Sequence, residues 1–440
     1  MTMSRDLPVV AVAYSGGRDS TALLHATWRT VQAQGGGSVL ALHVHHGLSA
    51  HADEWLSHAR HQCAQWLAQG APLRFEFRRI HRRPESGESI EAWARRERYL
   101  ALTDMARSAG ADMVLLAHHL QDQAETFLLQ ALRGAGVAGL AAMPEQVERG
   151  GIVWCRPWLR HSRDAIEDYV RLHGLSYVDD DSNCDSRFAR NRLRSMVLPA
   201  LVQAFPQALQ SLADAANWAQ QALDVAQEQA ENDLRQVLDE QGLSLQLAPW
   251  LVLPLARRSS ALRVWVLKVS GHAGSSALIQ RLLVELKKTG SHCWSHANGV
   301  LRSYRGQLSW AAANEHRRKP AEEQTCTQLR VRRAGVYRVP GWGGQLRVKR
   351  VEHGGVPMAW LGELALRGRT GGERFQAGLG RPPRSLKKQF QAAAVPEWDR
   401  QGPLIYSGGQ LVFVPGLGLD ARVLALPGQA QAMLFWEPLG

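Results

Sequence analysis

The chain has few cysteines: five among 440 residues, widely scattered and never arranged as CxxC. This scarcity argues against a disulfide framework, a zinc knuckle or an iron–sulfur site, each of which needs clustered cysteines. Dispersed thiols are typical of compartments that keep cysteine reduced. We therefore expect a cytoplasmic protein. The five positions are Cys63, Cys155, Cys184, Cys293 and Cys326.

Long apolar runs are also missing. No stretch of about 18 consecutive apolar residues occurs, so the sequence predicts no membrane-spanning helix and no membrane partner. The opening residues, MTMSRDLPVV, lack the pattern of a secretory signal. Hydrophobic residues still make up 45% of the chain, which is enough to fill real cores. The length predicts about three domains of ordinary size.

Acidic residues are the scarcer charge, with 40 Asp and Glu against 52 Lys and Arg, for a net charge of +12. Most of the excess lies in residues 329–440, which hold 16 basic and 7 acidic residues. A basic region of this kind favours a nucleic-acid partner. A solvated surface that only aids solubility would give the same count, so charge alone leaves both interpretations open.

Apolar runs and helical patterns alternate through residues 1–205. Such a βαβ series predicts an α/β fold, with a doubly wound, Rossmann-like parallel sheet that binds ligands at the carboxyl ends of its strands. We expect strands over 9–13, 39–47, 73–80, 111–119 and 152–159, and helices from Thr21 and over 51–69, 87–110, 121–134 and 160–175.

The remainder of the chain changes composition twice. Residues 206–313 open with a long Ala-, Gln- and acid-rich helical stretch and predict a helical middle domain. Residues 314–328 have no apolar periodicity over most of their length and predict a linker. Residues 329–440 are rich in Gly, Pro and short β-like runs, which predicts a small α+β domain.

The loop SGGRDS follows the apolar run 9–13 directly and precedes a helical pattern. Glycines allow an oxyanion to approach the backbone, and the free amides at a helix N-terminus point at it. Asp19 could hold magnesium or orient a nucleotide. The loop lacks GxxxxGK[ST] and GxGxxG, so it is neither a Walker A loop nor a dinucleotide turn. The alternative is an ordinary tight turn. The loop residues are Ser15, Gly16, Gly17, Arg18, Asp19 and Ser20.

Asp122 and Glu125 stand three residues apart where a helix is expected to begin, which places both carboxylates on one helical face. Facing a nucleotide crevice, they could bind magnesium or hold an ammonium group. The alternative is helix capping, because acids are common in a first helical turn.

Histidines end two of the expected strands. His43 and His45 should point one way and His46 the other, because side chains alternate along a strand. No carboxylate is spaced to complete a zinc site with them, so we expect these residues, like His118 and His119, to line the crevice.

Two groups of arginines are candidates for phosphate. Arg95 and Arg98 lie on one expected helix, where pairing with Glu91 and Glu97 is the alternative. The segment SRFARNRLR combines arginine, which suits bidentate phosphate recognition, with Phe188, which can stack on an unpaired base. Its arginines are Arg187, Arg190, Arg192 and Arg194.

Several motifs together carry a resemblance to a family. SGGRDS resembles the pyrophosphate loop of the N-type ATP pyrophosphatases, and the whole series resembles the bacterial tRNA(Ile)-lysidine synthetases in order and over nearly the whole chain. The matching segments are SGGRDS, HVHHGLS, EAWARRERY, AHHLQDQAETFLLQALRGAGVAGLAAM, RPWL, VDDDSNCDSRFARNRLRSMVLPAL, LRGRTGGERFQ and RSLKKQFQAAAVPEWDR.

The resemblance implies a two-step ligase. ATP adenylates the C2 oxygen of the wobble cytosine in a CAU-anticodon tRNA(Ile), releasing pyrophosphate. The ε-amine of L-lysine then displaces AMP, and codon specificity changes from AUG to AUA. ATP and Mg²⁺ are therefore expected, with lysine and tRNA as partners. A homodimer is left open. Two alternatives are another pyrophosphate-loop tRNA-modifying enzyme, such as a thiolase, and a non-catalytic RNA-binding protein on this fold.

The resemblance also implies roles for individual residues. Asp19, Asp122 and Glu125 would be catalytic, Asp19 would hold Mg²⁺, and Asp122 and Glu125 would bind lysine. The family usually has a second aspartate where this chain has Gln121. ATP would contact Ser15, Gly16, Gly17, Arg18, Asp19, Ser20, His46 and Arg95. The middle and C-terminal domains would bind tRNA, the latter through exposed residues at helical spacing. The tRNA-binding residues would be Arg187, Arg190, Arg192, Arg194, Arg384, Lys387 and Lys388.

Overall fold

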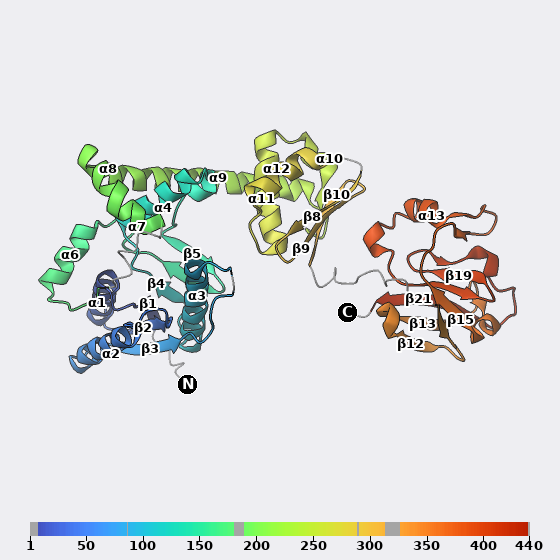
Figure 1. The fold of residues 1–440 in the computed structure, drawn as a ribbon, viewed down its shortest axis with the longest axis horizontal. Helices are drawn as coiled ribbons and strands as arrows, with labels where there is room; N and C mark the ends of the chain where they lie inside the picture. The colour runs from blue at the N-terminus through green and yellow to red at the C-terminus, as the bar shows by residue number, and fades with distance from the viewer. Residues whose placement is uncertain (1–7, 86, 180–188, 288–289, 313–325, 439–440) are drawn as a thin grey trace. The chain divides into compact units, whose positions relative to one another are not determined.

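A computed structural model describes residues 8–85, 87–179, 189–287, 290–312 and 326–438. The chain divides into two compact units, Met1–Ala226 and Gln227–Gly440 (Figure 1). Most of the predicted linker and Arg187 fall outside the described residues. No described helix is both long and apolar enough to cross a membrane.

The first unit is built on a six-stranded sheet with the order β3-β2-β1-β4-β6-β5. The first five strands of this order are parallel and β5 pairs with β6 antiparallel. The parallel sheet predicted from the βαβ pattern is therefore confirmed. The strands are β1 (Val9–Ala13), β2 (Ser38–His45), β3 (Leu73–Arg79), β4 (Met113–Leu115), β5 (Gln146–Arg149) and β6 (Ile152–Cys155).

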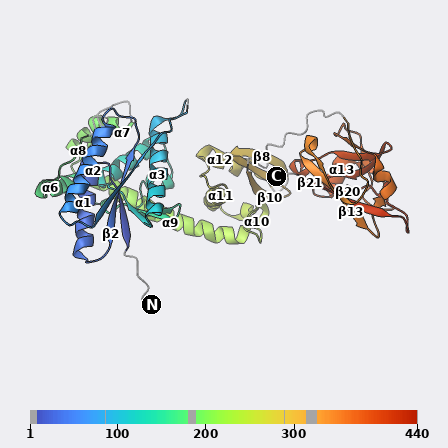
Figure 2. The ribbon, with the colours of Figure 1, turned by 90° about the horizontal axis from the view of Figure 1, so that it is seen from below.

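Both faces of this sheet are covered. Val39 and Ala41 of β2 pack into a core that includes residues of α1 and α2, whereas Leu40 and Leu42 pack into a second core with α3. Figure 2 shows α1 and α2 on one side of the sheet and α3 on the other. Strands buried on both faces need apolar side chains at nearly every position, which is why they appear as unbroken apolar runs. The helices are α1 (Arg18–Ala33), α2 (Ala52–Ala68) and α3 (Ile90–Ser108).

The strand order reverses direction at β1. The chain passes from β1 outward to β2 and β3, and then crosses over to β4 on the other side of β1. Such a switch point opens a crevice at the carboxyl ends of the two central strands. The SGGRDS loop leaves β1 there, and His118 and His119 follow β4. The helices after β4 are α4 (Leu120–Leu132), α5 (Val137–Leu140), α6 (Arg163–Leu172), α7 (Ala189–Arg192), the π-helix η2 (Leu193–Val197) and α8 (Leu198–Ala204).

The long helix α9 (Ala208–Val237) contains the boundary between the units. Beyond it, the second unit holds the helices that the sequence predicts and also a four-stranded antiparallel sheet that it does not. Trp250 and Trp265 are fully buried where the helices meet this sheet. The elements are β7 (Leu245–Gln246), α10 (Leu247–Val252), α11 (Leu255–Ser270), α12 (Ser276–Glu285), β8 (Ser291–His296), β9 (Gly299–Tyr304) and β10 (Gln307–Ala312).

The last part of the chain is mostly β structure. Two antiparallel sheets, β11-β15-β18-β19-β20 and β12-β13-β21-β14, share one apolar core. The strands are β11 (Thr327–Leu329), β12 (Gly335–Val339), β13 (Gly344–Val351), β14 (Val356–Pro357), β15 (Leu364–Arg367), β16 (Arg374–Phe375), β17 (Arg384–Ser385), β18 (Leu404–Ser407), β19 (Gln410–Val414), β20 (Gly418–Leu419) and β21 (Gln431–Pro438).

One helix, α13 (Leu386–Ala392), interrupts these strands. Lys387 and Lys388 lie on it and are exposed, as predicted. Arg384 is exposed as well, but its predicted helical spacing to the lysines is wrong because it belongs to the short strand β17. The helix begins only after that strand has paired with β16.

Candidate active site

The SGGRDS loop is held open by its own hydroxyl groups. The amide of Ser15 donates to Oγ of Ser20 at 3.2 Å, and the two hydroxyl oxygens lie 3.0 Å apart. Ser20 Oγ in turn donates to the carbonyl of Gly17 at 2.9 Å. Gly17 caps α1 and has no side chain to occupy the anion-binding end of this helix, although its own amide donates to Ser15 Oγ at 3.3 Å.

Gly16 needs to be glycine in this loop. Its φ is +88°, and a Cβ there would lie 3.3 Å from Cγ2 of Val178. The Gly16 carbonyl also accepts the amide of Val178 at 3.0 Å. The strained turn is therefore fixed in place by a segment far along the chain.

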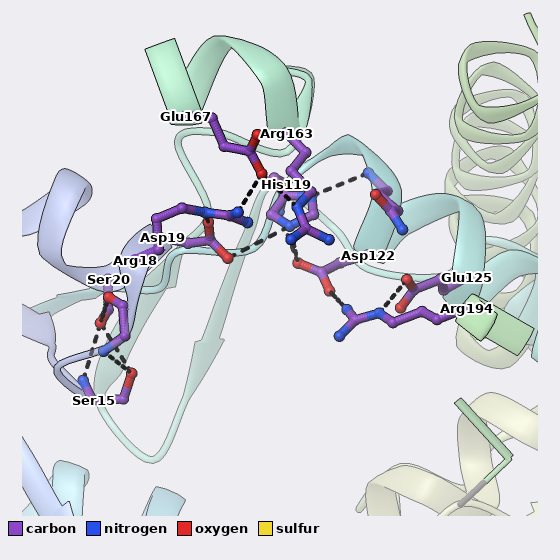
Figure 3. A network of polar contacts seen from close by, with 12 residues as sticks. Ser15, Arg18, Asp19, Ser20, His119, Asp122, Glu125, Arg163, Glu167 and Arg194 are labelled. Atoms are coloured by element: carbon purple, nitrogen blue, oxygen red, sulfur yellow. Dashed lines mark hydrogen bonds and ion pairs between the residues drawn. The ribbon is translucent and has the colours of Figure 1, made fainter. Parts of the chain in front are cut away.

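Arg18 and Asp19 lie side by side between the loop and α6 (Figure 3). Arg18 donates from Nε to Asp19 Oδ1 at 2.9 Å and also pairs with Glu167 of α6. Arg163 binds the same Glu167 oxygen from 3.0 Å. Asp19 keeps 29% of its side chain exposed, so its carboxylate remains accessible to solvent.

His119 connects the loop to α4. Its Nδ1 accepts the amide of Gln121 at 3.2 Å, which assigns the ring hydrogen of the neutral form to Nε2. Nε2 faces Asp19 Oδ2 at 3.7 Å and Asp122 Oδ2 at 3.5 Å. His119 therefore lies between Asp19, which is predicted to bind magnesium, and Asp122, which is predicted to bind lysine.

Asp122 and Glu125 share one cation (Figure 3). Arg194 donates from one nitrogen to Asp122 Oδ1 at 2.9 Å and from Nε to Glu125 Oε1 at 2.5 Å. Asp122 also caps α4, because its Oδ2 accepts the amide of His119 at 3.1 Å. The helix-capping interpretation is therefore correct for this oxygen, whereas the other oxygen binds Arg194. We call Asp122 and Glu125 the acid pair.

The second oxygen of Glu125 is different. The side chain is fully buried, and Oε2 has no hydrogen-bond partner among the described residues. Nε of Arg190 lies 3.4 Å away without forming a hydrogen bond, while another Arg190 nitrogen donates to Thr126 Oγ1 at 2.8 Å. A buried carboxylate oxygen left in this state is ready to accept a further donor.

Burial and charge set the pKa values of the acid pair apart. Burial raises the pKa of Glu125, and the nearby Asp122 adds to this effect, although Arg194 opposes it. Burial also disfavours ionised Asp122, but His119, His118 and Arg194, together with the His119 amide, outweigh it and lower the Asp122 pKa. When the pKa values of two neighbouring carboxyl groups shift in opposite directions, one group can stay charged while the other exchanges a proton.

The two arginines of the SRFARNRLR segment that lie beside these acids belong to consecutive helical elements. Arg190 lies on α7, whereas Arg194 lies in the π-helical turn η2. π-helical turns occur often at functional sites. Arg192 is exposed. The predicted tRNA-binding residues Arg190 and Arg194 are therefore drawn into the crevice, and their role toward tRNA stays a prediction.

The strand-end histidines point as predicted. His43 donates from Nδ1 to the carbonyl of Tyr14 at 2.9 Å, and His45 lies 3.3 Å from Asp53 of α2. His46 turns the other way, where Arg98 of α3 donates to its Nε2 at 3.4 Å. Burial lowers the pKa of His43 and of His46 to about 4, so both rings are neutral near pH 7.

Sequence reasoning missed several residues of the crevice. Glu167 orients Arg18 from α6, and its separation of 149 residues along the chain leaves no local signal. Arg156 is 6% exposed directly after β6. The sequence could have indicated Arg156, because it is the arginine of RPWL, one of the segments that carry the family resemblance.

Comparisons with known proteins agree with this geometry. Three family models match the chain: a PP-loop domain over residues 2–201, a TilS substrate binding domain over 245–309 and a TilS substrate C-terminal domain over 364–436. Curated proteins named tRNA(Ile)-lysidine synthase are similar throughout. The protein of Burkholderia mallei is 40% identical, covering 94% of this chain and 90% of its own. Those of Ralstonia nicotianae and Chromobacterium violaceum are 39% and 36% identical, covering 96% and 97% of this chain and 92% and 94% of their own.

A phosphate-binding loop at the switch point of a parallel sheet, matched by the PP-loop model, defines an ATP-using enzyme of the pyrophosphate-loop class. Within that class, the chain belongs to the tRNA(Ile)-lysidine synthase family. It is therefore an ATP-dependent ligase.

Proposed function

We propose that this chain joins L-lysine to C2 of the wobble cytidine in a CAU-anticodon tRNA(Ile). The observation that carries the proposal is the continuous polar path from the SGGRDS loop through His119 to the acid pair. Such a path brings a site for ATP and a site for an amine together in one crevice. The family membership supplies the nucleic-acid substrate for this arrangement.

The loop would bind the phosphates of ATP. The hydroxyls of Ser15 and Ser20, the glycine backbone and the first turn of α1 supply donors, and Arg18 and Asp19 lie beside them. In the first step, the cytidine C2 oxygen attacks the α-phosphorus. The bond from that phosphorus to the pyrophosphate breaks, and pyrophosphate leaves.

The residues beside the loop fit a magnesium ion. Asp19 presents a partly exposed carboxylate at the crevice, and Mg²⁺ in such sites takes one or two carboxylates together with substrate phosphates. Asp19 would hold the ion, which would neutralise charge on the phosphates. Asp122 is less available, because Arg194 and the His119 amide already occupy its oxygens.

The acid pair would hold lysine for the second step. Glu125 Oε2 is the carboxylate oxygen without a hydrogen-bond donor, and the raised pKa of Glu125 suits a group that takes a proton from an ammonium. The freed amine attacks C2, a C–N bond forms, and the bond from C2 to the adenylate oxygen breaks. AMP leaves as the second product. Arg194 fixes the other oxygens of the pair during this step.

The basic last quarter of the chain would grip the tRNA through its phosphates. Arg384, Lys387 and Lys388 are exposed and form no ion pair among the described residues. Such side chains suit contacts that position a nucleic acid without reading its bases. This part of the proposal concerns affinity and leaves the chemistry to the crevice.

The test is incubation of the purified chain with ATP, Mg²⁺, labelled lysine and total tRNA, followed by nucleoside analysis. The proposal expects label in a single modified cytidine, with AMP and pyrophosphate formed in equal amounts. A thiolated nucleoside, formed only with a sulfur donor, would favour the other pyrophosphate-loop chemistry. Tight tRNA binding without any ATP cleavage would favour a non-catalytic RNA-binding protein.

A further inference from the structure

Arg156 is a buried cation that lacks an acidic partner. It follows β6 and is 6% exposed. One terminal nitrogen donates to the carbonyl of Pro144 at 2.8 Å, and the side chain also bonds the Tyr99 hydroxyl. Its Nε is buried without a hydrogen-bond partner, and no described carboxylate forms an ion pair with it. A guanidinium buried in this way is costly unless an anion reaches it.

Other cationic and polar groups gather around Arg156. The guanidinium of Arg95 lies over the Tyr99 ring, 5.3 Å from its centre, so two arginines meet at one tyrosine. His118 follows β4, the strand next to β6, and its Nδ1 is also buried without a partner among the described residues. We call Arg95, Arg156, Arg190 and His118 the cationic cluster.

Electrostatics are consistent with this grouping. Burial lowers the pKa of His118 to about 4, with Arg156, Arg95 and Arg190 contributing to this shift and Asp122 opposing it. His118 is therefore a neutral ring between the arginines and the acid pair. Its unpartnered nitrogen adds a polar group to a site that already holds an excess of positive charge.

The cationic cluster lies directly beside the acid pair. Arg190 belongs to it, and its Nε is 3.4 Å from the unpartnered Oε2 of Glu125. A partly buried positive region next to a buried negative one matches a small zwitterion, with its ammonium at the acids and its carboxylate at the arginines. A phosphate of the RNA chain suits this position less well, because the arginine that lacks a partner is buried rather than on an open surface.

We propose that the cationic cluster binds the α-carboxylate of the amino-acid substrate and so holds its distant amine toward Glu125. The inference rests on the proposed function and extends it: it makes Arg156 and Arg95 the groups that distinguish an amino acid from a simple diamine. It also gives Arg95 a role toward lysine in place of the role toward ATP that the resemblance implied.

The test compares lysine with 1,5-diaminopentane, which has the same amine chain and no carboxylate. The native chain should prefer lysine. Arg156→Gln and Arg95→Gln should raise the KM for lysine about 10- to 100-fold, the worth of a hydrogen bond to a charged group, and leave the KM for the diamine unchanged. Pyrophosphate release that depends on tRNA but not on lysine should keep its rate. Arg107→Gln, on the same helix as Arg95 and bonded to the Gly150 carbonyl, is the matched control.

Other outcomes overturn the inference. An increase in the KM for ATP or tRNA, with the preference for lysine intact, would show that the cluster binds a phosphate. If Arg156→Gln fails to fold because its site is buried, Arg95→Gln decides alone, since its side chain is exposed. Failure of the native chain to transfer lysine would defeat the proposed function itself. Lysine transfer with full preference for lysine in both variants would defeat only this inference.

Discussion

The crevice of the first unit and the basic surface of residues 329–440 use charged residues in opposite ways. In the crevice, Asp122 and Glu125 are buried, and Arg194 bonds to both. The last quarter of the chain has 16 basic residues and only 7 acidic ones, and Lys387 and Lys388 are exposed. Charged side chains are therefore held in a buried network in the crevice and exposed to solvent on the basic surface.

This difference separates two kinds of sensitivity. A buried network holds each member in one geometry, so losing one partner leaves another uncompensated and costs several kcal/mol. Exposed cations act in water, are screened by salt and contribute in small, roughly equal steps. The crevice should therefore respond to single substitutions, and the basic surface only to combined ones. The predictions below are arranged from the largest expected effect to the smallest.

Asp19→Ala should reduce adenylation at least about a hundredfold, because it removes the carboxylate that faces the phosphates. The fold should persist, since Asp19 lies in a turn and is partly exposed. Tracking AMP formation in the presence of tRNA measures the effect. Asp164→Ala, another acid in the first turn of a helix, should behave as the native chain does. Normal AMP formation by Asp19→Ala would remove the loop from the chemistry.

Glu125→Gln should slow lysine transfer about a hundredfold, the usual contribution of a positioned base, while tRNA-dependent pyrophosphate release continues. Rapid-quench measurement of the two products distinguishes the steps. If both steps fell together, Glu125 would belong with the magnesium ligands instead.

Arg194→Gln should move the acid limb of lysine transfer to higher pH. Transfer needs the Glu125 carboxylate and is lost as the pH falls through its already raised pKa. Arg194 opposes this rise most strongly, through a hydrogen bond and its charge. Arg190 opposes it less, from the other oxygen and without a hydrogen bond, and Asp122 adds to it. A pH–rate profile of the second step is the measurement, and Arg171→Gln on the outside of α6 serves as control. An unmoved acid limb would mean that another group sets it.

The triple change of Arg384, Lys387 and Lys388 to Ala should raise the apparent KM for tRNA and flatten its salt dependence, by about one unit of log–log slope for each lost contact. The KM values for ATP and lysine should not move, because these residues lie outside the crevice.

A triple variant of the first unit serves as the matched control for this prediction. Arg74, Arg133 and Arg171 are exposed, and changing them to Ala removes the same charge from a different surface. A folded C-terminal variant with the native salt slope, or a control triple with an equal loss, would assign the basic surface to solubility.

Much of the first unit could be predicted from sequence. The run Val9–Ala13 and the helix patterns after it predict β1 and the acid pair at the start of a helix, because the central strands are largely buried and the polar clusters follow strand ends. The pattern of apolar and polar residues within a segment is enough to predict a strand or helix when that segment's own residues determine its burial.

The contacts between distant segments could not be predicted in this way. Arg194 contacts Glu125 and Asp122 across separations of 69 and 72 residues, and nothing in RNRLR indicates which of its arginines would do so. The sheet β7-β10-β9-β8 could not be predicted because polar residues such as His292 and Ser295 interrupt the apolar pattern of β8. Arg384 was placed on a helix because spacing alone does not reveal pairing with Phe375.

The ratio of pyrophosphate released to lysine incorporated, measured side by side for the native chain, Asp19→Ala and Glu125→Gln, tests the division of the crevice most directly. With the loop acting on ATP and the acid pair on lysine, the ratio should be one for the native chain and rise well above one for Glu125→Gln, and both products should vanish for Asp19→Ala. A ratio that stays at one in Glu125→Gln, with both products reduced equally, would contradict that division.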